Sequence, residues 1–187
     1  MLNRTIREAG RPAVVVMGVS GAGKSAIGAA LAGELGVPFV DGDDLHPREN
    51  IAKMADGMAL NDHDRLPWLE RVRQTLAAAV HDGAGMVVAC SALTRGYRAV
   101  ISREAPTTIF AMLDARCSML DGSLAELRRN LSSREGHFMP ESLLESQLAL
   151  LEPVGEDERG RSVRIGVPVL AVVAAALAAV DAVRADA

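Results

Sequence analysis

The sequence predicts an α/β fold, in which helices cover both faces of a mainly parallel β-sheet. Short runs of apolar and β-branched residues alternate along the chain with segments of helical periodicity, and glycine or proline separates most of them. Strands that are apolar at every position are typical of parallel sheets buried on both faces. The 187 residues fit one domain and no linker indicates a second, so we expect a single domain over residues 1–187 with an N-terminal extension at 1–11.

The first half of the chain contains two expected strands and two expected helices. Residues 13–17 (AVVVM) form the first strand, and residues 37–40 form the second. The helix between them ends at Gly36, and its expected inner face is Ile27, Ala30, Leu31 and Leu35. Residues 45–64 show no clean period, and a long loop of this kind inside one domain is more often functional than idle. A helix resumes at Pro67, with an expected inner face of Leu69, Val72, Leu76 and Val80.

The second half continues the alternation. Three more strands are expected at 86–90, 108–113 and 161–167. Helices are expected at 97–104, 124–133 and 140–151, and a closing helix has Pro168 at its first position. The segment Met112–Ala115 (MLDA) is nearly repeated as Met119–Gly122 (MLDG), and nothing in the sequence explains this near-repeat.

Composition and charge exclude several classes of function. Twenty Lys and Arg against 24 Asp and Glu give a net charge of −4, whereas a nucleic-acid binder normally carries a basic face. The longest apolar run, 169–180, is shorter than a bilayer span of roughly 20 residues, and residues 1–12 lack the apolar segment of a signal peptide. Cys90 and Cys117 stand alone, as buried small side chains in a reducing compartment. We therefore expect a cytoplasmic protein that binds neither nucleic acid nor membrane.

The strongest chemical signal is a complete GxxxxGK[ST] motif between the first strand and the first helix. Its residues are the candidate nucleotide-binding positions: Gly18, Val19, Ser20, Gly21, Ala22, Gly23, Lys24 and Ser25. Glycines let backbone N–H groups approach phosphate oxygens, and the helix N-terminus adds partial positive charge. Lys24 is expected to reach the β- and γ-phosphates, and the Ser25 hydroxyl to bind Mg²⁺. The motif predicts a three-layer P-loop NTPase fold that binds a nucleoside triphosphate.

Two carboxylates, Asp41 and Asp43, follow the second strand. Ligands of open α/β sheets bind at the carboxyl ends of the strands, so both are expected beside the transferred phosphoryl group. We assign Asp43 as the general base that accepts the proton of an attacking hydroxyl, and Asp41 as support for the metal ion or the substrate. Taken alone, Asp-Gly-Asp-Asp is typical of an acidic surface turn, and only the preceding phosphate loop favours the functional interpretation. No NKxD segment for guanine is present, which argues against a GTPase switch.

Several segments together resemble the gluconate kinases of the small, shikimate-kinase-like phosphate-loop type. They lie between about residues 13 and 155 and are 17–25 (MGVSGAGKS), 41–47 (DGDDLHP), 50–54 (NIAKM), 60–69 (LNDHDRLPWL), 90–93 (CSAL), 97–98 (YR), 136–140 (GHFMP), 146–147 (SQ) and 151–153 (LEP). The resemblance implies phosphorylation of D-gluconate on its 6-hydroxyl by ATP with Mg²⁺, which supplies 6-phosphogluconate to the pentose-phosphate and Entner–Doudoroff routes. It also implies a five-stranded parallel sheet, a small helical lid at about 124–151 and commonly a homodimer.

A small polyol with one carboxylate requires a cation and many hydrogen-bonding groups in its site. We expect Arg65 to bind the carboxylate bidentately, a geometry that lysine cannot reproduce, and a solvent-exposed arginine at a helix start is the ordinary alternative. The other candidates for the substrate pocket, besides Asp43, are His46, Lys53, Tyr97, Arg98, His137 and Gln147. Trp68 is expected to be a core anchor rather than a ligand platform.

Arginines around the expected lid helix are candidates for stabilising the γ-phosphate when the lid closes. Arg134 is assigned to catalysis and Arg129 to nucleotide binding. Gluconate kinases usually carry an arginine seven residues before the histidine of Gly-His-Phe, and this chain has Asn130 there. Either Arg128 or Arg129 substitutes for it, or Arg134 acts alone. The ordinary alternative for all three arginines is a solvated basic helix face.

Two other functions stay open at the level of sequence. One is a kinase for another small hydroxy acid, such as shikimate, or for a nucleoside monophosphate. The other is a nucleotide-binding module that does not phosphorylate a small molecule. The many polar side chains between Asp41 and Arg65 speak against the second, because a bare switch has little use for them.

Overall fold

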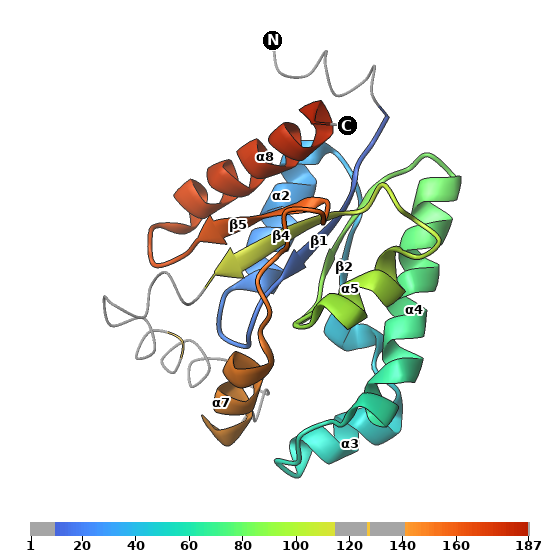
Figure 1. The fold of residues 1–187 in the computed structure, drawn as a ribbon, viewed down its shortest axis with the longest axis vertical. Coiled ribbons are helices and arrows are strands. Elements are labelled where there is room, and N and C mark those ends of the chain that lie inside the picture. Colours follow the sequence, from blue (N-terminus) through green and yellow to red (C-terminus); the bar gives the residue numbers. More distant parts are fainter. Residues whose placement is uncertain (1–9, 115–126, 128–140, 187) are drawn as a thin grey trace.

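Five parallel strands form the central sheet, in the order β2-β3-β1-β4-β5 (Figure 1). The computed structural model describes residues 10–114, 127 and 141–186. The strands are β1 (Ala13–Met17), β2 (Phe39–Asp41), β3 (Met86–Ala89), β4 (Ile109–Asp114) and β5 (Gly160–Arg164). The α/β class and the five-stranded parallel sheet are therefore confirmed.

Strand β1 suits the centre of the sheet because all of its side chains are apolar and its backbone pairs with a strand on each side. All five of its residues are buried, and it pairs with β3 on one side and β4 on the other. Its β-branched valines suit a pleated surface that is covered on both faces. The loop that follows β1 therefore begins from the most rigid part of the fold.

Two layers of helices cover the sheet (Figure 1). Helices α2 (Lys24–Leu35) and α8 (Val169–Ala185) pack on one face, and α4 (Asp62–His81) and α5 (Arg95–Ser102) on the other. The short 3₁₀ helix η1 (Gly42–Leu45) and helix α3 (Arg48–Ala55) follow β2, and α7 (Glu141–Leu150) precedes β5. Within the described part of the chain, no helix combines the length and the apolarity of a membrane span.

The prediction of a long loop at 45–64 is wrong, because this segment contains the last residue of η1, the whole of α3 and the first residues of α4. Helix α4 begins at Asp62, five residues before the expected start at Pro67. A reciprocal capping box is the reason: Asp64 N–H donates to Asn61 Oδ1 at 2.9 Å, and Asn61 N–H donates to Asp64 Oδ2 at 2.8 Å. Pro67 lies inside the helix and omits only one backbone hydrogen bond.

Two smaller expectations also need correction. Ala30 is exposed, and the inner face of α2 is Ile27, Gly28, Leu31, Ala32 and Leu35. Gly28 is required there because a Cβ atom would meet Phe39 Cε2 at 2.8 Å. Pro168 is the N-cap of α8 with extended backbone, not its first helical residue. The other strand and helix bounds agree with the expected ones within about three residues.

The expected lid is described only in part. Helix α7 confirms the helix expected at 140–151, and Leu127 is buried in the core. Arg128, Arg129, Asn130, Arg134 and His137 lie outside the described residues, as do Cys117 and the second half of the near-repeat.

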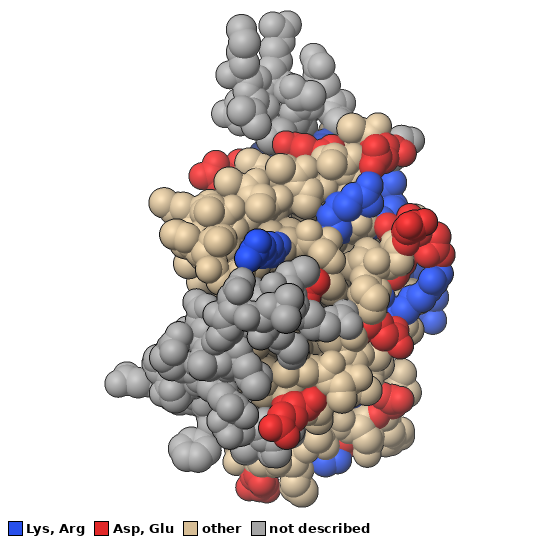
Figure 2. Space-filling view, turned by 60° about the vertical axis from the view of Figure 1, so that its left-hand side comes forward, with Lys and Arg blue, Asp and Glu red and all other residues tan. Residues whose placement is uncertain are grey.

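The surface charges, Cys90 and Trp68 lie as the sequence predicts. Figure 2 shows acidic and basic side chains interspersed on the described part of one face. Cys90 is buried, and burial raises the pKa of its thiol to about 12. Trp68 is 1% exposed and its indole N–H donates to Gly42 O at 2.7 Å, so its expected role as a core anchor is confirmed.

The capping box at the start of α4 predicts a measurable loss of stability. Asn61→Ala removes the acceptor for the Asp64 N–H and should lower the free energy of unfolding by about 1 kcal/mol. Asn61→Ser keeps a cap and should stay within a few tenths of a kcal/mol of the natural protein. Urea denaturation followed by the fluorescence of the single tryptophan measures both variants. Equal losses in the two would contradict the cap as the cause of the early helix start.

Candidate functional site

The carboxyl ends of three adjacent strands converge on one cavity of about 420 Å³. The phosphate loop follows β1, Asp41 ends β2, and Ser91 comes shortly after β3. Six of the residues predicted from sequence line this cavity: Ser20, Lys24, Asp43, His46, Arg65 and Gln147. The fold thus brings the phosphate loop and part of the expected substrate site to one place, as ligand binding in open α/β sheets requires.

The phosphate loop packs so closely against other backbone that only glycine fits at two positions. Gly18 (φ 143°) and Gly21 (φ 80°) have positive φ, and a Cβ on them would meet Leu113 O at 2.9 Å and Leu127 O at 2.6 Å. Helix α2 begins at Lys24, so the N–H groups of its first turn have no partner within the helix. Such a loop and helix N-terminus bind anions, and the site therefore fits the phosphates of a nucleotide.

Two hydrogen bonds attach the phosphate loop to neighbouring segments. Gly18 N–H donates to Ser91 O at 3.3 Å, and Ser20 N–H donates to Gln147 Oε1 at 2.7 Å. Gln147 comes from α7, 127 residues away in sequence. The Lys24 ammonium donates to Val19 O at 3.1 Å within the loop itself. Gln147 thus has a defined contact with the loop, in addition to its place in the cavity wall.

The acidic turn after β2 separates the roles of its two carboxylates. Asp41 is the N-cap of η1, and its Oδ1 accepts from Asp43 N–H at 3.1 Å. Asp41 is not among the residues that line the cavity, whereas Asp43 and Asp44 are. The side chain of Asp41 shapes the turn that presents Asp43.

His46 forms a neutral wall of the cavity. Its ring stacks on Trp68 with the centroids 4.6 Å apart, and its Nδ1 lies 3.4 Å from Asn50 Nδ2. Burial lowers its pKa from 6.5 to about 4, and the nearby Asp43 opposes the shift only in part. At neutral pH the imidazole is therefore uncharged and offers hydrogen bonds without adding charge.

Arg65 lies in the cavity wall and is held from behind by Tyr97. The Tyr97 hydroxyl accepts from Arg65 Nη1 at 2.8 Å and itself donates to Asp62. Burial, followed by this bond to Asp62, raises the pKa of Tyr97. The nearest carboxylate to Arg65, that of Asp62, is 3.8 Å away and exposed. Arg65 thus keeps its charge largely available for a ligand, and Tyr97 acts through Arg65 rather than in the cavity wall itself.

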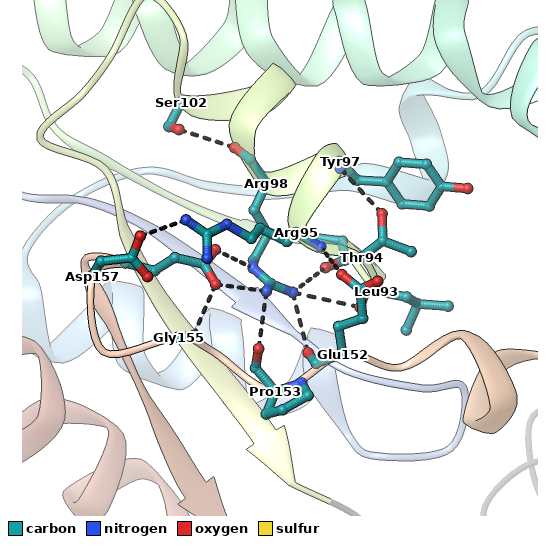
Figure 3. Close-up of polar contacts among 12 residues, drawn as sticks. Leu93, Thr94, Arg95, Tyr97, Arg98, Ser102, Glu152, Pro153, Gly155 and Asp157 are labelled. Atoms are coloured by element: carbon teal, nitrogen blue, oxygen red, sulfur yellow. Dashed lines mark hydrogen bonds and ion pairs between the residues drawn. The ribbon is translucent and has the colours of Figure 1, made fainter.

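The structure places two other predicted substrate residues away from the cavity. Lys53 is paired with Asp64 at 2.5 Å, next to the capping box of α4. Arg98 is 1% exposed and its guanidinium binds Glu158 on the side of α5 that faces the segment before β5 (Figure 3). Neither is among the residues that line the cavity, and their expected contact with the substrate stays a prediction.

Sequence reasoning missed a second cavity and most of the apolar wall of the first. The second, of about 100 Å³, lies between Gly21–Gly23 of the phosphate loop and residues 165–169 after β5. The apolar wall of the first includes Ile51, Met54, Met58, Leu60 and Leu93. All of these except Met58 lie in segments that carry the family resemblance, but no expectation assigned them to the site. The signal for the second cavity was the glycine and proline after β5, which mark a turn beside the loop.

The protein oxygen atoms near Lys24 suit a magnesium ion that is held mainly by the phosphates of a bound nucleotide. The described residues contain no cluster of three His, Cys, Asp or Glu side chains with metal-binding geometry. Ser25 supplies a hydroxyl oxygen at the start of α2. Mg²⁺ prefers oxygen donors, and it is commonly bound by one or two protein oxygens together with substrate phosphates. The residues present therefore fit Mg²⁺ on a nucleotide and not a metal caged by protein alone.

Comparison with known proteins agrees with this geometry. A family model described as an AAA domain matches residues 14–154. The chain is 46% identical over 145 residues to the gluconokinase of Gluconobacter oxydans (strain 621H), covering 78% of each chain. It is 40% identical to the thermosensitive gluconokinase of Escherichia coli (strain K12), covering 78% of this chain and 74% of that one.

A solved structure extends the likeness to the whole fold. The crystal structure of a gluconokinase from Sinorhizobium meliloti 1021 aligns with a TM-score of 0.81 and 41% identity, over 94% of this chain and 95% of that chain. This alignment covers more of the chain than the family model, which matches residues 14–154. The chain is a member of the AAA-domain family and, within it, of the gluconokinases.

Proposed function

We propose that this protein transfers the γ-phosphoryl group of ATP to the 6-hydroxyl of D-gluconate. The observation that supports this most strongly is a single cavity bordered by Lys24 of the phosphate loop and by Asp43, His46 and Arg65. Relatives named gluconokinase match 78% of this chain at 40–46% identity. No feature of the described residues favours a different acceptor.

Each end of the nucleotide has a candidate place. The first-turn N–H groups of α2 and the Lys24 ammonium would bind the phosphates, and the small apolar cavity beside Gly21–Gly23 would hold the base. Ser25 would hold Mg²⁺, which when bound neutralises charge on the phosphate oxygens. One oxygen of Asp41 is engaged by Asp43 N–H, so its proposed support of the metal or substrate rests on the other oxygen.

The acceptor is positioned by charge at one end and by hydrogen bonds along its length. Arg65 would bind the gluconate carboxylate, and the neutral His46 and Gln147 would bind hydroxyl groups. Asp43 then accepts the proton of the 6-hydroxyl as that oxygen forms its bond to the γ-phosphorus. The bond from the γ-phosphorus to the bridging oxygen breaks, and ADP leaves with 6-phosphogluconate as the other product.

Some expectations stay predictions of the family resemblance. Arg129, Arg134 and His137 are proposed lid residues that complete the site, and they lie outside the described residues. A homodimer is proposed on the same basis, and a cytoplasmic location stays a prediction from the sequence pattern.

A substrate panel tests the proposed reaction. With Mg²⁺-ATP, ADP release should be stimulated by gluconate well above shikimate, other aldonates and nucleoside monophosphates. Lys24→Met should reduce gluconate-stimulated release by at least about 100-fold with the fold intact, because it removes the cation that reaches the phosphates. ATP binding without stimulation by any acceptor would favour a nucleotide-binding module instead.

Asp43→Asn tests the base. It should lower kcat by about 10²- to 10⁴-fold while the KM for ATP changes little, because a general base acts in the transition state. Asp56→Asn is the matched control, since it removes one carboxylate from the exposed end of α3 without touching the cavity. Steady-state kinetics separate the two variants. A kcat for Asp43→Asn within a factor of three of the natural enzyme would reassign the base.

The buried His46 predicts a pH dependence of stability. Its pKa is about 4 when folded and near 6.5 when unfolded, so between these values the unfolded chain binds the proton and the folded chain does not. The contribution is absent above pH 7, and the free energy of unfolding should fall by about 2–3 kcal/mol between pH 7 and pH 4.5.

His46→Gln removes this titration. The difference in unfolding free energy between His46→Gln and the natural protein should therefore change across the same pH range, as urea denaturation measures. His63→Gln, at an exposed position of α4, should instead leave the pH dependence of the natural protein in place. Parallel pH curves for the natural protein and His46→Gln would show that the folded and unfolded states bind the His46 proton equally well, which would contradict the lowered pKa.

A further inference from the structure

One buried guanidinium contacts the turn before α5 and two successive parts of the loop between α7 and β5 (Figure 3). Arg98 of α5 makes a bidentate pair with Glu158, from Nε to Oε1 at 2.6 Å and from Nη2 to Oε2 at 2.8 Å. The hydrogen bond from Arg98 lowers the pKa of Glu158. Nη2 also donates to Pro153 O at 3.1 Å, and Nη1 to Glu152 O at 3.2 Å. A buried ion pair offsets the cost of its desolvation only when the remaining hydrogen-bond donors also have partners. Here the other guanidinium donors bind backbone carbonyl oxygens.

The first segment held by Arg98 is a strained turn. Ala92 has φ 40°, the one positive φ among the non-glycine residues that the structure describes. A residue in this region persists when its surroundings restrain it. Arg98 Nη1 lies 3.5 Å from Ala92 O and 3.4 Å from Leu93 O. The carbonyl oxygen of Ser91, the residue before Ala92 in this turn, accepts the Gly18 N–H of the phosphate loop.

The second segment follows α7. Glu152 N–H donates to Leu93 O at 2.9 Å, and the Glu152 carboxylate accepts from Arg95 N–H at 2.5 Å. These bonds join the end of α7 to the same turn whose carbonyls face Arg98. Helix α7 carries Gln147, which accepts the Ser20 N–H of the phosphate loop.

The third segment precedes β5 and closes the arrangement. Glu158 Oε2 accepts from Gly155 N–H at 2.8 Å as well as from Arg98. Arg95 pairs with Asp157 on the outside of the same loop (Figure 3). The loop is therefore held from both sides, and Arg98 has a fixed counter-ion that cancels its charge.

We propose that Arg98 is a positioning residue for phosphoryl transfer. Arg98 fixes the position of the turn at Ser91–Leu93, whose Ser91 carbonyl accepts the Gly18 N–H. It also fixes the end of α7, the helix whose Gln147 accepts the Ser20 N–H. It touches neither cavity, so it acts through Ser91 and Gln147 and not on a ligand. The kinetic part of this proposal rests on the proposed gluconate kinase activity, and the structural part rests only on the phosphate loop.

Arg98→Lys tests the proposal, because lysine keeps the charge but cannot make the bidentate pair and the carbonyl contacts together. The amides of Gly18 and Ser20 should exchange with solvent at least about tenfold faster relative to those of Val14–Val16 in β1, as measured by NMR. The kcat per folded molecule should fall by at least about tenfold, because misplaced groups lose much of their catalytic effect.

Arg73→Lys is the matched control. Arg73 is also a buried arginine with carboxylate partners, Glu70 and Glu104, and it lies on α4 away from both cavities. It should lose comparable thermal stability without a selective change in exchange at Gly18 and Ser20 and without a change in kcat. If Arg98→Lys behaves like Arg73→Lys, Arg98 only stabilises the fold and the proposal is overturned.

Two further variants keep the test decisive. If Arg98→Lys does not fold, Glu158→Gln leaves the guanidinium in place with a weaker partner, and it should show the same selective exchange on a smaller scale. In Arg98→Lys, adding Ala92→Gly removes the strain at the turn, because glycine adopts positive φ freely, and should restore part of kcat. No recovery would overturn the restraint of the turn by Arg98.

The two proposals fail in different ways. If gluconate is not phosphorylated but exchange at Gly18 and Ser20 rises selectively, the proposed function is wrong and the positioning role stands. If gluconate is phosphorylated and neither exchange nor kcat responds selectively to Arg98→Lys, the positioning role is wrong and the proposed function stands.

Discussion

The close approach of the phosphate loop to neighbouring backbone is the constraint on which the rest of the site depends. At Gly18 and Gly21 no side chain fits, because carbonyl oxygens of Leu113 and Leu127 occupy the space where a Cβ would be. The loop therefore follows a single path off the end of β1, the most deeply buried strand. That path directs the first turn of α2 at the cavity, and the N–H groups of this turn, which have no partner within the helix, supply an anion site before any side chain contributes.

The basic side chains near this anion site differ in whether a counter-ion inside the protein cancels their charge. Arg98 has its counter-ion in Glu158 inside the protein, so its charge is cancelled and its role is geometric. Arg65 is held by the neutral hydroxyl of Tyr97, which fixes its direction without cancelling its charge. His46 is uncharged at neutral pH because it is buried against Trp68. Among the described residues that line the cavity, the positive charges are Lys24 and Arg65, which suits the phosphates of one ligand and the carboxylate of another.

Much of the fold could be predicted from local pattern. Continuous apolar runs identified β1, β3 and β4, because a strand buried on both faces has few polar positions, whereas the edge strand β5 carries exposed Arg161, Ser162 and Arg164. The start of α4 was misjudged because Pro67 is a stronger local signal than the capping box at Asn61, and the structure tolerates a proline that lacks one hydrogen bond. The inner face of α2 was misjudged because Gly28 has no side chain to count as apolar, yet its smallness is what lets Phe39 approach.

The sequence alone determined the chemistry that is local in the chain: the phosphate loop, the acidic turn after β2 and the membership of a family whose segments are recognisable one by one. These depend on residues within a few positions of each other, so spacing is sufficient evidence. Only the tertiary structure decided which of the remaining polar residues face the cavity. Tyr97 and Arg98 are neighbours on one helix, yet one turns toward Arg65 and the other toward Glu158. Successive helical residues point about 100° apart, and which direction leads to the ligand depends on partners that lie far away in sequence.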